Sequence, residues 1–337
     1  MATIKDIAKE TNLSLGTISK FINGGNVLEE NRVLIETAIK KFDFKVNELA
    51  RGLKTNRTMV IGVLIPSLGN IFCTSIISNI ENILLQNGYG AIICDYKEDP
   101  VLEYDKLTFL LNKMVDGIVM MPLKCDERQV TDIIAKGTPV VLIDRMIQGV
   151  NCDVVLVDNL NASYNAVEHL ITNGHKRIGI ITGPENIYTA QERLKGYIRV
   201  HEDYAMGIDH NLVKYGDYHL QSGYDSLLQL LNLSNPPTAV YVTNYEMTLG
   251  AIIAINERNL KIPDDLSFIG FDNLELARIV KPSLSIVVQP VEQIGETAAQ
   301  ILLRRLKGDQ IDFPVVERLK TSLLIKESVR NLKANLI

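Results

Sequence analysis

Residues 3–25 read TIKDIAKETNLSLGTISKFINGG and contain two short helical patterns close together. In the first, apolar residues recur at the spacing of one helix face, and Thr3 can cap the helix together with Asp6. Ser14 is a favourable N-cap for the second pattern, which a Gly-Gly pair ends. Two short helices about four residues apart, the second rich in small polar residues, predict a helix-turn-helix.

A third helical pattern follows over residues 30–42, and it places Leu34, Ala38, Ile39 and Phe42 on an inward face. Residues 1–60 carry 10 Lys and Arg against 7 Asp and Glu, whereas the rest of the chain carries 25 against 33. A small basic module therefore precedes an acidic body. This asymmetry fits a head that contacts phosphates, joined to a body that does not.

The rest of the chain alternates continuous apolar runs with helical stretches. Such runs are typical of parallel strands that are covered on both faces, so the body is predicted to be an open α/β sheet structure. IGVLIP and IGIITGP each open a strand–loop–helix half, which indicates two similar lobes with a ligand cleft at the carboxyl ends of their strands. The predicted strands lie in residues 59–66, 89–94, 116–122, 139–144, 154–158, 177–182, 239–244, 266–272 and 284–289.

Composition and motifs exclude several classes of protein. No run of about 18 apolar residues occurs, and the start of the chain lacks the features of a secretory signal, so a cytoplasmic protein is expected. The cysteines are far apart and are expected to be buried hydrophobic residues. The five histidines show no metal-ligand spacing, and GxSxG, GxxxxGK[ST] and GxGxxG are all absent. We expect neither an enzyme nor a cofactor or metal site. The cysteines are Cys73, Cys94, Cys125 and Cys152.

Six segments in colinear order resemble the LacI/GalR (lactose-repressor) family of transcription regulators. Besides residues 3–25, they are NELARGLKTNRT (47–58), DNLNASYNAVEHLITNGHKRIGIITG (158–183), ERLKGY (192–197), IPDDLSFIGFDN (262–273) and LKTSLLIKES (319–328). The resemblance implies an all-α helix-turn-helix head and a two-lobed, periplasmic-binding-protein-like core of Rossmann type. The implied parts are a DNA-binding domain (1–46), a hinge (47–58), a first lobe (59–160 and 290–319) and a second lobe (161–289 and 320–330).

The resemblance also implies which residues contact operator DNA. The second helix would enter the major groove, with Leu15 and Gly16 at base-reading positions and Lys20 one turn later. The hinge would form a minor-groove helix on DNA, with Leu53 wedged between base steps. Helix capping is the alternative role for Ser14, and ordinary packing is the alternative for Leu53. The implied contacts are Ser14, Leu15, Gly16, Thr17, Ser19, Lys20, Asn23, Asn47, Ala50, Arg51, Leu53 and Lys54.

In the body, the resemblance marks positions for a small-molecule effector, and their chemistry suits a sugar or sugar derivative. Carboxylates, amides and Arg forks bind hydroxyl groups, while aromatic faces cover C–H surfaces. For each Asp, a strand-end cap or turn is the alternative role. The marked residues are Ser67, Asn70, Phe72, Asp144, Arg193, Tyr218, Asn244, Tyr245, Asp272 and Gln289.

Four departures from the family pattern indicate an atypical operator or effector, and one of them is Val46 in place of the Pro before the hinge Asn. Tyr245 stands where an acidic residue commonly follows the Asn, so one hydroxyl-accepting carboxylate is expected to be missing. Leu28 replaces the Ser that usually caps the third helix. Lys20 replaces the commoner Arg, which weakens two-pronged recognition of guanine.

We expect a homodimer whose two heads straddle a pseudo-palindrome. Its pairing face would include the amphipathic stretch from residue 76 to residue 84, for which core packing is the alternative role. Two other functions remain open: a periplasmic-type sugar-binding protein, and a regulator controlled by a protein co-regulator. The apolar residues of the stretch are Ile76, Ile77, Ile80, Ile83 and Leu84.

Overall fold

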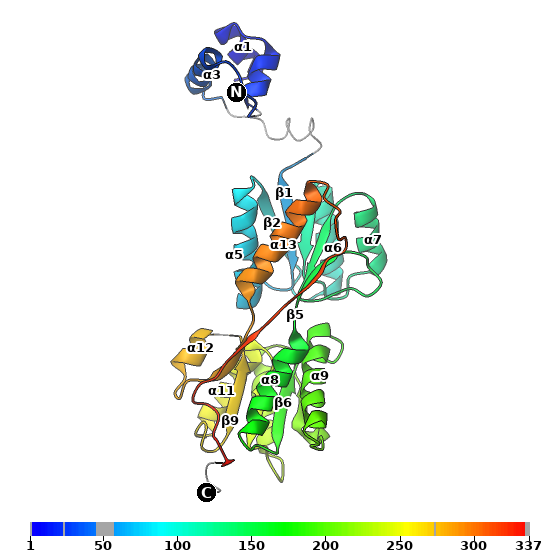
Figure 1. The fold of residues 1–337 in the computed structure, drawn as a ribbon, viewed down its shortest axis with the longest axis vertical. Helices are drawn as coiled ribbons and strands as arrows, with labels where there is room; N and C mark the ends of the chain where they lie inside the picture. The colour runs from blue at the N-terminus through cyan, green and yellow to red at the C-terminus, as the bar shows by residue number, and fades with distance from the viewer. Residues whose placement is uncertain (1, 23, 45–56, 273, 334–337) are drawn as a thin grey trace. The chain divides into compact units, whose positions relative to one another are not determined.

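The chain consists of two units, Met1–Met59 and Val60–Ile337. Within the parts of the chain that the structure describes, no helix is long and apolar enough to cross a lipid bilayer. The computed structural model in Figure 1 describes residues 2–22, 24–44, 57–272 and 274–333.

The described residues of the first unit contain three helices, and a small core lies where they meet. The side chains of Ile7, Ile18, Ile35 and Ala38 are buried there. Each helix contributes to this core, as the helical spacing of the sequence predicts. The helices are α1 (Ile4–Thr11), α2 (Leu15–Ile22) and α3 (Glu29–Lys41).

The structure confirms both predicted N-caps of the first two helices. The backbone N–H of Thr3 donates to the Asp6 carboxylate at 2.7 Å. The hydroxyl oxygen of Ser14 accepts a hydrogen bond from the backbone N–H of Thr17 at 3.1 Å. These bonds satisfy N–H groups that have no partner within the helix, so they set where α1 and α2 begin.

The third helix departs from its predicted inward face at one position. Leu34 is 49% exposed, so its assignment to the core was wrong, and Ile35 is buried in its place. Ile35 and Ala38 lie three residues apart and therefore share the helix face that packs on α1 and α2. At the start of α3, Leu28 occupies the N-cap position without a side-chain hydrogen bond.

The second unit contains two six-stranded sheets, and the first of them is entirely parallel. Its strand order is β11-β5-β4-β3-β1-β2. One face is covered by α6 (Pro100–Asn112) and α7 (Glu127–Ala135), and helices α5 (Ile71–Gln86) and α13 (Val291–Leu306) pack together on the other. The strands are β1 (Val60–Ile65), β2 (Gly90–Asp95), β3 (Gly117–Met120), β4 (Val140–Ile143), β5 (Asp153–Val157) and β11 (Val316–Leu319).

The second sheet has the order β12-β10-β9-β8-β6-β7, and only its edge strand β12 runs antiparallel to its neighbour. The strands are β6 (Ile178–Thr182), β7 (Val213–Tyr215), β8 (Ala239–Val242), β9 (Ser267–Phe271), β10 (Ser285–Val288) and β12 (Ser322–Leu324). The helices of this half are α8 (Asn159–Thr172), α9 (Tyr188–Asp203), the short η1 (His210–Leu212), α10 (Leu220–Leu231), α11 (Tyr245–Glu257) and α12 (Leu274–Ile279).

The chain crosses between the two sheets three times. The crossings join β5 to α8, β10 to α13 and β11 to β12. Figure 1 shows these segments as the connections between the two halves of the second unit. The two-lobed architecture expected from the sequence is therefore confirmed, and the crossings lie beside the space between the lobes.

Most of the predicted pairing stretch of α5 belongs to the core of the lobe. Ile76, Ile80 and Leu84 are fully buried, so their assignment to a pairing surface was wrong and the core-packing alternative holds for them, while Ile83 is only half-buried. A close approach to α13 explains this burial. A Cβ atom on Gly295 of α13 would lie 2.7 Å from the backbone oxygen of Ile76. Glycine at this position therefore lets the two helices pack backbone against backbone.

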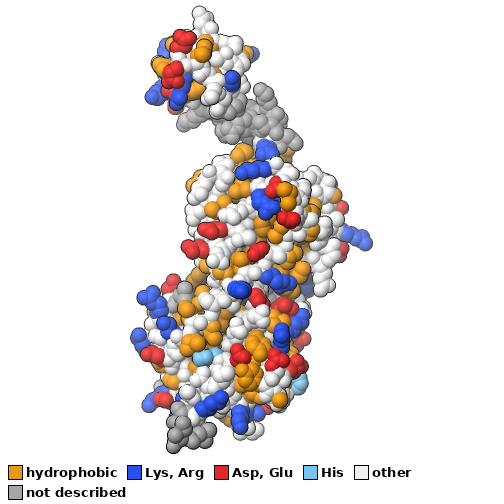
Figure 2. All heavy atoms as spheres, viewed as in Figure 1, with side chains coloured by type: hydrophobic (Ala, Val, Ile, Leu, Met, Phe, Trp, Pro, Cys, Tyr) orange, Lys and Arg blue, Asp and Glu red, His pale blue; other side chains and the backbone are white. Residues whose placement is uncertain are grey.

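A buried ion pair fixes α13 to the first sheet. Arg305 donates from Nε and Nη2 to the two carboxylate oxygens of Asp153, at 2.8 and 2.9 Å. Both side chains are almost fully inaccessible to solvent, so each charge depends on the other. On the visible outer face of the second unit, by contrast, acidic and basic side chains are interspersed (Figure 2).

Candidate functional site

The outward face of α2 carries the polar groups predicted to contact DNA. Ser14, Gly16 and Lys20 are exposed, Thr17 and Ser19 are half-buried, and Leu15 is also exposed. A shallow groove lies along this face. Its lining residues are Ser14, Gly16, Thr17, Lys20, Asn26, Val27, Leu28 and Asn31.

The Ser14 hydroxyl caps α2, but it remains exposed and can also donate a hydrogen bond to a phosphate. The other predicted DNA contacts cannot be placed on the structure. Asn23, Asn47, Ala50, Arg51, Leu53 and Lys54 lie outside the described residues.

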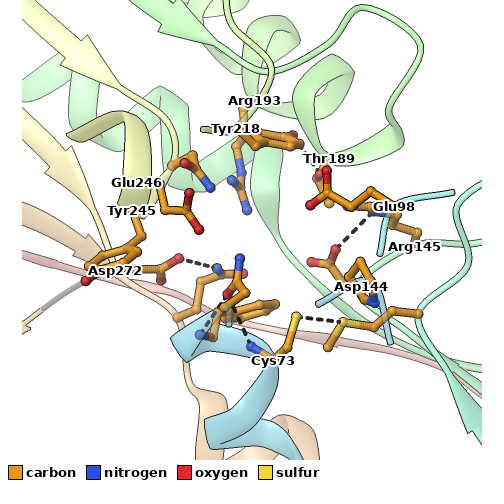
Figure 3. Close-up of a pocket in the computed structure, with 16 residues that line it drawn as sticks. Cys73, Glu98, Asp144, Arg145, Thr189, Arg193, Tyr218, Tyr245, Glu246 and Asp272 are labelled. Atoms are coloured by element: carbon orange, nitrogen blue, oxygen red, sulfur yellow. Dashed lines mark hydrogen bonds and ion pairs between the residues drawn. The ribbon is translucent and has the colours of Figure 1, made fainter. Parts of the chain in front are cut away.

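A pocket in the second unit lies between the two sheets, at the carboxyl ends of their parallel strands (Figure 3). Nine of the ten residues predicted for effector binding line it, and only Ser67 does not. The Ser67 hydroxyl instead accepts a hydrogen bond from the backbone N–H of Gly69. The nine are Asn70, Phe72, Asp144, Arg193, Tyr218, Asn244, Tyr245, Asp272 and Gln289.

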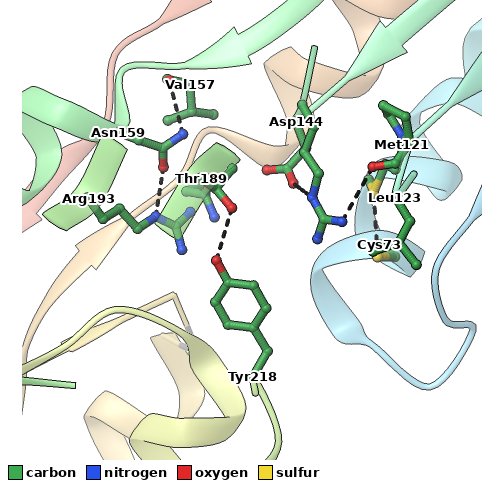
Figure 4. Close-up of polar contacts among 12 residues, drawn as sticks. Cys73, Met121, Leu123, Asp144, Val157, Asn159, Thr189, Arg193 and Tyr218 are labelled. Carbon is green, nitrogen blue, oxygen red and sulfur yellow. Dashed lines mark hydrogen bonds and ion pairs between the residues drawn. The ribbon is translucent and has the colours of Figure 1, made fainter. Parts of the chain in front are cut away.

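Arg193 is held in one orientation by three contacts. Its Nε donates to Asn159 Oδ1 at 2.7 Å (Figure 4), and its Nη1 donates to the backbone oxygen of Thr243 at 2.6 Å. The guanidinium also lies over the ring of Phe271, 3.9 Å from the ring centre. The side chain is 5% exposed, and Nη2 makes no hydrogen bond with the described residues. Arg193 therefore presents one donor nitrogen to the pocket.

Asp272 and Gln289 form the opposite wall. The side-chain amide of Gln289 donates to Asp272 Oδ2 at 2.9 Å. Burial raises the pKa of Asp272 to about 6, although Arg193 and Gln289 pull it downward. Gln289 is 4% exposed, and its Oε1 is buried without a hydrogen-bond partner among the described residues. A buried oxygen without a hydrogen bond costs free energy, so a ligand that donates a hydrogen bond to it would bind favourably.

Two asparagines present donors to the same space. Asn70 Oδ1 accepts from the backbone N–H of Phe72 at 2.9 Å, which caps α5. Asn244 Oδ1 accepts from the N–H of Met247 at 3.1 Å, which caps α11. Because each oxygen is engaged in its helix cap, the Nδ2 group of each residue is the part left to face a ligand.

Four pocket residues have a left-handed backbone, although none is glycine. The φ angles are 56° for Glu98, 66° for Asp144, 71° for Tyr218 and 60° for Asp272. Each such residue costs of order 1 kcal/mol and persists only where the surrounding structure holds it in place. Because these conformations gather at ligand-binding sites, their presence in one pocket supports a binding role.

The pocket also contains residues that sequence reasoning did not assign to it. Glu98 and Met121 follow strands β2 and β3, so the strand-end rule used for Asp144 would have found them. Glu246 directly follows Tyr245, and its carboxylate lies in the pocket. The expectation that the site lacks one carboxylate was therefore wrong, since the next residue supplies it. The unassigned lining residues are Pro66, Cys73, Glu98, Met121, Arg145, Thr189 and Glu246.

Outside the pocket, the buried titratable groups have structural partners. His175 contacts Thr238 Oγ1 at 2.9 Å and the backbone oxygen of Arg330 at 3.2 Å, and burial lowers its pKa. It ties β6 to the C-terminal segment. Across the described ranges, His, Cys, Asp and Glu side chains form no group suited to hold a metal ion.

Comparisons with known proteins relate the chain to transcription regulators along its whole length. Residues 167–329 match the family model "Periplasmic binding protein-like domain". The chain is 33% identical to catabolite control protein A of Priestia megaterium, over 94% of this chain and 96% of that protein. It is 31% identical to the HTH-type transcriptional repressor PurR of Actinobacillus pleuropneumoniae, over 98% of this chain and 99% of that protein.

A solved structure shows the same relationship in three dimensions. The transcriptional regulator CelR in complex with cellobiose superimposes with a TM-score of 0.74 at 27% identity. The match covers 97% of this chain and 100% of that one, so it includes both the helical unit and the two-lobed unit.

Proposed function

Because this chain belongs to the LacI/GalR family of DNA-binding transcription regulators, we propose that the pocket between its lobes binds the small molecule that controls operator binding. The proposed effector is a sugar or sugar derivative, and the proposed role is that of a repressor. Relatives in this family are regulators rather than enzymes, and we extend that to this chain by assigning the pocket a binding role without catalysis.

The main support for the proposal is that hydrogen-bond donors, hydrogen-bond acceptors and aromatic rings surround the same pocket. A sugar hydroxyl donates one hydrogen bond and accepts others, so a polyol needs donors and acceptors side by side. Arg193, Asn70 and Asn244 supply donors, while Asp272 and the unpaired Oε1 of Gln289 supply acceptors. Three rings complete the set, because aromatic faces suit the C–H surfaces of a sugar. They belong to Phe72, Tyr218 and Tyr245.

For the DNA contact, we propose that α2 lies in the major groove. Lys20 would bind a phosphate or a guanine edge, Leu15 would contact a base edge, and Gly16 would permit close approach. Ser14, Thr17 and Ser19 would position the helix through phosphate contacts. The hinge contacts stay sequence-based predictions: Asn47, Ala50, Arg51, Leu53 and Lys54, together with Asn23 after α2.

We further propose that the functional parts are a head (1–46), a hinge (47–58) and two lobes (59–160 with 290–319, and 161–289 with 320–330). A bound effector contacts both lobes and so favours one lobe arrangement over others. In a homodimer this would alter the spacing of two hinges and hence the fit to a two-fold operator. The proposed site of action is the cytoplasm, where the DNA lies.

Two measurements test the proposal. A thermal-shift screen of sugars, sugar phosphates, nucleosides and purines, with cellobiose included, should identify at least one compound that raises the melting temperature. Fluorescence anisotropy on DNA from the protein's own promoter region should then show a changed affinity when that compound is added. If no compound changes either quantity while DNA still binds, control by a protein co-regulator replaces the small-molecule proposal.

A further inference from the structure

The inner part of the pocket is close to charge balance. Arg145 Nε lies 3.3 Å from Asp144 Oδ2, so these two charges offset each other. Arg193 attracts the negative charge of Asp272 and opposes the effect of burial on that carboxyl. A guanidinium thus offsets the charge of each inner carboxylate, by an ion pair for Asp144 and by electrostatic attraction for Asp272, and the inner pocket does not by itself favour a charged ligand.

Two further carboxylates, those of Glu98 and Glu246, lack such a partner. Both point into the central space of the pocket in Figure 3. Within the described part of the chain, neither forms an ion pair with Lys or Arg. Each instead lies near one imidazole: His219 Nε2 is 3.5 Å from Glu98, and His219 Nδ1 is 3.7 Å from Glu246. Two carboxylates share one imidazole, so the site stays negative whether or not His219 is protonated.

The position of Glu98 is fixed by its own loop. Lys97 and Glu98 are consecutive residues in the left-handed region, with φ of 51° and 56°. Asp95 Oδ1 accepts from the N–H of Lys97 at 2.7 Å, and the N–H of Glu98 donates to the oxygen of Pro66 at 3.1 Å. This tight turn, which costs conformational energy, holds the Glu98 backbone at the carboxyl end of β2 beside the pocket.

The pair also spans the two lobes. Glu98 follows β2 of the first sheet, whereas Glu246 lies in the first turn of α11 and His219 caps α10, both in the second half. A ligand in this pocket therefore lies in a space that carboxylates from both lobes line. The buried, unpaired Oε1 of Gln289 independently calls for a ligand that donates a hydrogen bond.

We propose that Glu98 and Glu246 select the effector by charge: the pocket accepts a neutral or amine-bearing polyol and rejects phosphate esters and carboxylates. The inference rests on the proposed function, because it concerns the ligand of the same pocket. The phosphate group of a monoester offers mainly acceptors and negative charge near neutral pH. That group cannot donate to Gln289 Oε1 and is repelled by two nearby carboxylates, whereas a hydroxyl or an ammonium group can donate to the amide oxygen and lie beside the carboxylates.

Calorimetric titration of the full chain with matched probes tests the proposal. The probes are glucose, glucosamine and glucose 6-phosphate, with ribose and ribose 5-phosphate as a second series. The wild type should bind a neutral or amino sugar at least about tenfold tighter than the phosphate ester of that series. In the Glu98→Gln, Glu246→Gln double variant this ratio should fall about tenfold. The control Glu81→Gln, at an exposed position of α5 away from the pocket, should keep the wild-type ratio.

Each possible outcome of these titrations supports or overturns the proposed charge selection. A wild type that binds the phosphate ester as tightly as the sugar overturns the charge selection but leaves the proposed effector site standing. A double variant with an unchanged ratio overturns the assignment to Glu98 and Glu246. Should that variant fail to fold, each single Gln variant must shift the ratio about threefold. If no sugar of any charge binds at all, the proposed function fails, and this inference with it.

Discussion

Replacing Arg193 by Met should separate effector binding from DNA binding. In the folded protein the substitution removes two hydrogen bonds from a charged donor, to Asn159 at 2.7 Å and to Thr243 at 2.6 Å. Such bonds contribute about 1.5–3 kcal/mol each, but water can rehydrate part of the site, so we expect a loss of about 3 kcal/mol in the free energy of unfolding. Met keeps the packing on Phe271, which limits the loss.

The effect on the ligand is a separate quantity. Nη2 of Arg193 is the nitrogen that faces the pocket, and one hydrogen bond from a charged donor is again worth about 1.5–3 kcal/mol. Effector affinity should therefore fall about 10-fold to 150-fold. Operator affinity without effector should stay within about twofold of the wild type, because Arg193 belongs to the other structural unit.

Urea unfolding, calorimetry with the compound found in the screen, and anisotropy on promoter DNA measure the three quantities. Arg258→Met, at an exposed position just after α11, is the matched control and should change none of them. An Arg193→Met protein that binds the effector as tightly as the wild type would refute the role assigned to this pocket.

Four other changes have defined outcomes. Asp272→Asn should flatten the pH dependence of stability. Folding raises the pKa of this carboxyl from 3.8 to about 6, so the protonated carboxyl contributes fully to the free energy of unfolding below pH 4, and up to about 3 kcal/mol of that contribution is lost by pH 7. Urea titrations at pH 5 and 7 check this. Asp153→Leu should cost about 3–5 kcal/mol by leaving Arg305 unpaired, and adding Arg305→Met should restore most of it in the same assay. Lys20→Ala should reduce the salt dependence of DNA binding by about one counterion if the residue binds a phosphate, and an unchanged slope would point to base contact. Leu53→Ala, outside the described residues, should weaken operator binding far more than binding to random DNA; equal loss on both would reject the wedge role.

Much of the fold follows from the sequence because buried parallel strands leave a strong signal. All nine predicted runs overlap a strand, and apart from β2 these strands have largely buried side chains. The three strands that were not predicted, β7, β11 and β12, are short and mostly exposed. Their side chains form no continuous apolar run, and their pairing depends on distant segments. Exposed edge strands of this kind are defined by tertiary contacts rather than by local pattern.

Pocket residues could be predicted where they lie at the end of a strand with a clear apolar pattern. Several pocket residues that lie in loops were not predicted. Asp144, Asp272 and Gln289 stand directly after predicted strands and line the pocket. Glu246 was not predicted because the family pattern has its acidic residue directly after the Asn, where this sequence has Tyr245. The face of α5 was misread because an amphipathic pattern shows that a face is buried, but not by what. In α5 that burial comes from α13, more than 200 residues along the chain.

The decisive measurement is an anisotropy titration of the wild-type protein on its own promoter DNA, at one fixed salt concentration, with and without the compound that stabilises it most. We predict that the two dissociation constants differ by about 5-fold to 150-fold, the usual range of coupling between two sites. In Arg193→Met, at the same concentration of the compound, most of that difference should vanish. Equal dissociation constants for the wild type, at a compound concentration that saturates the pocket, would contradict the proposal that this pocket controls operator binding.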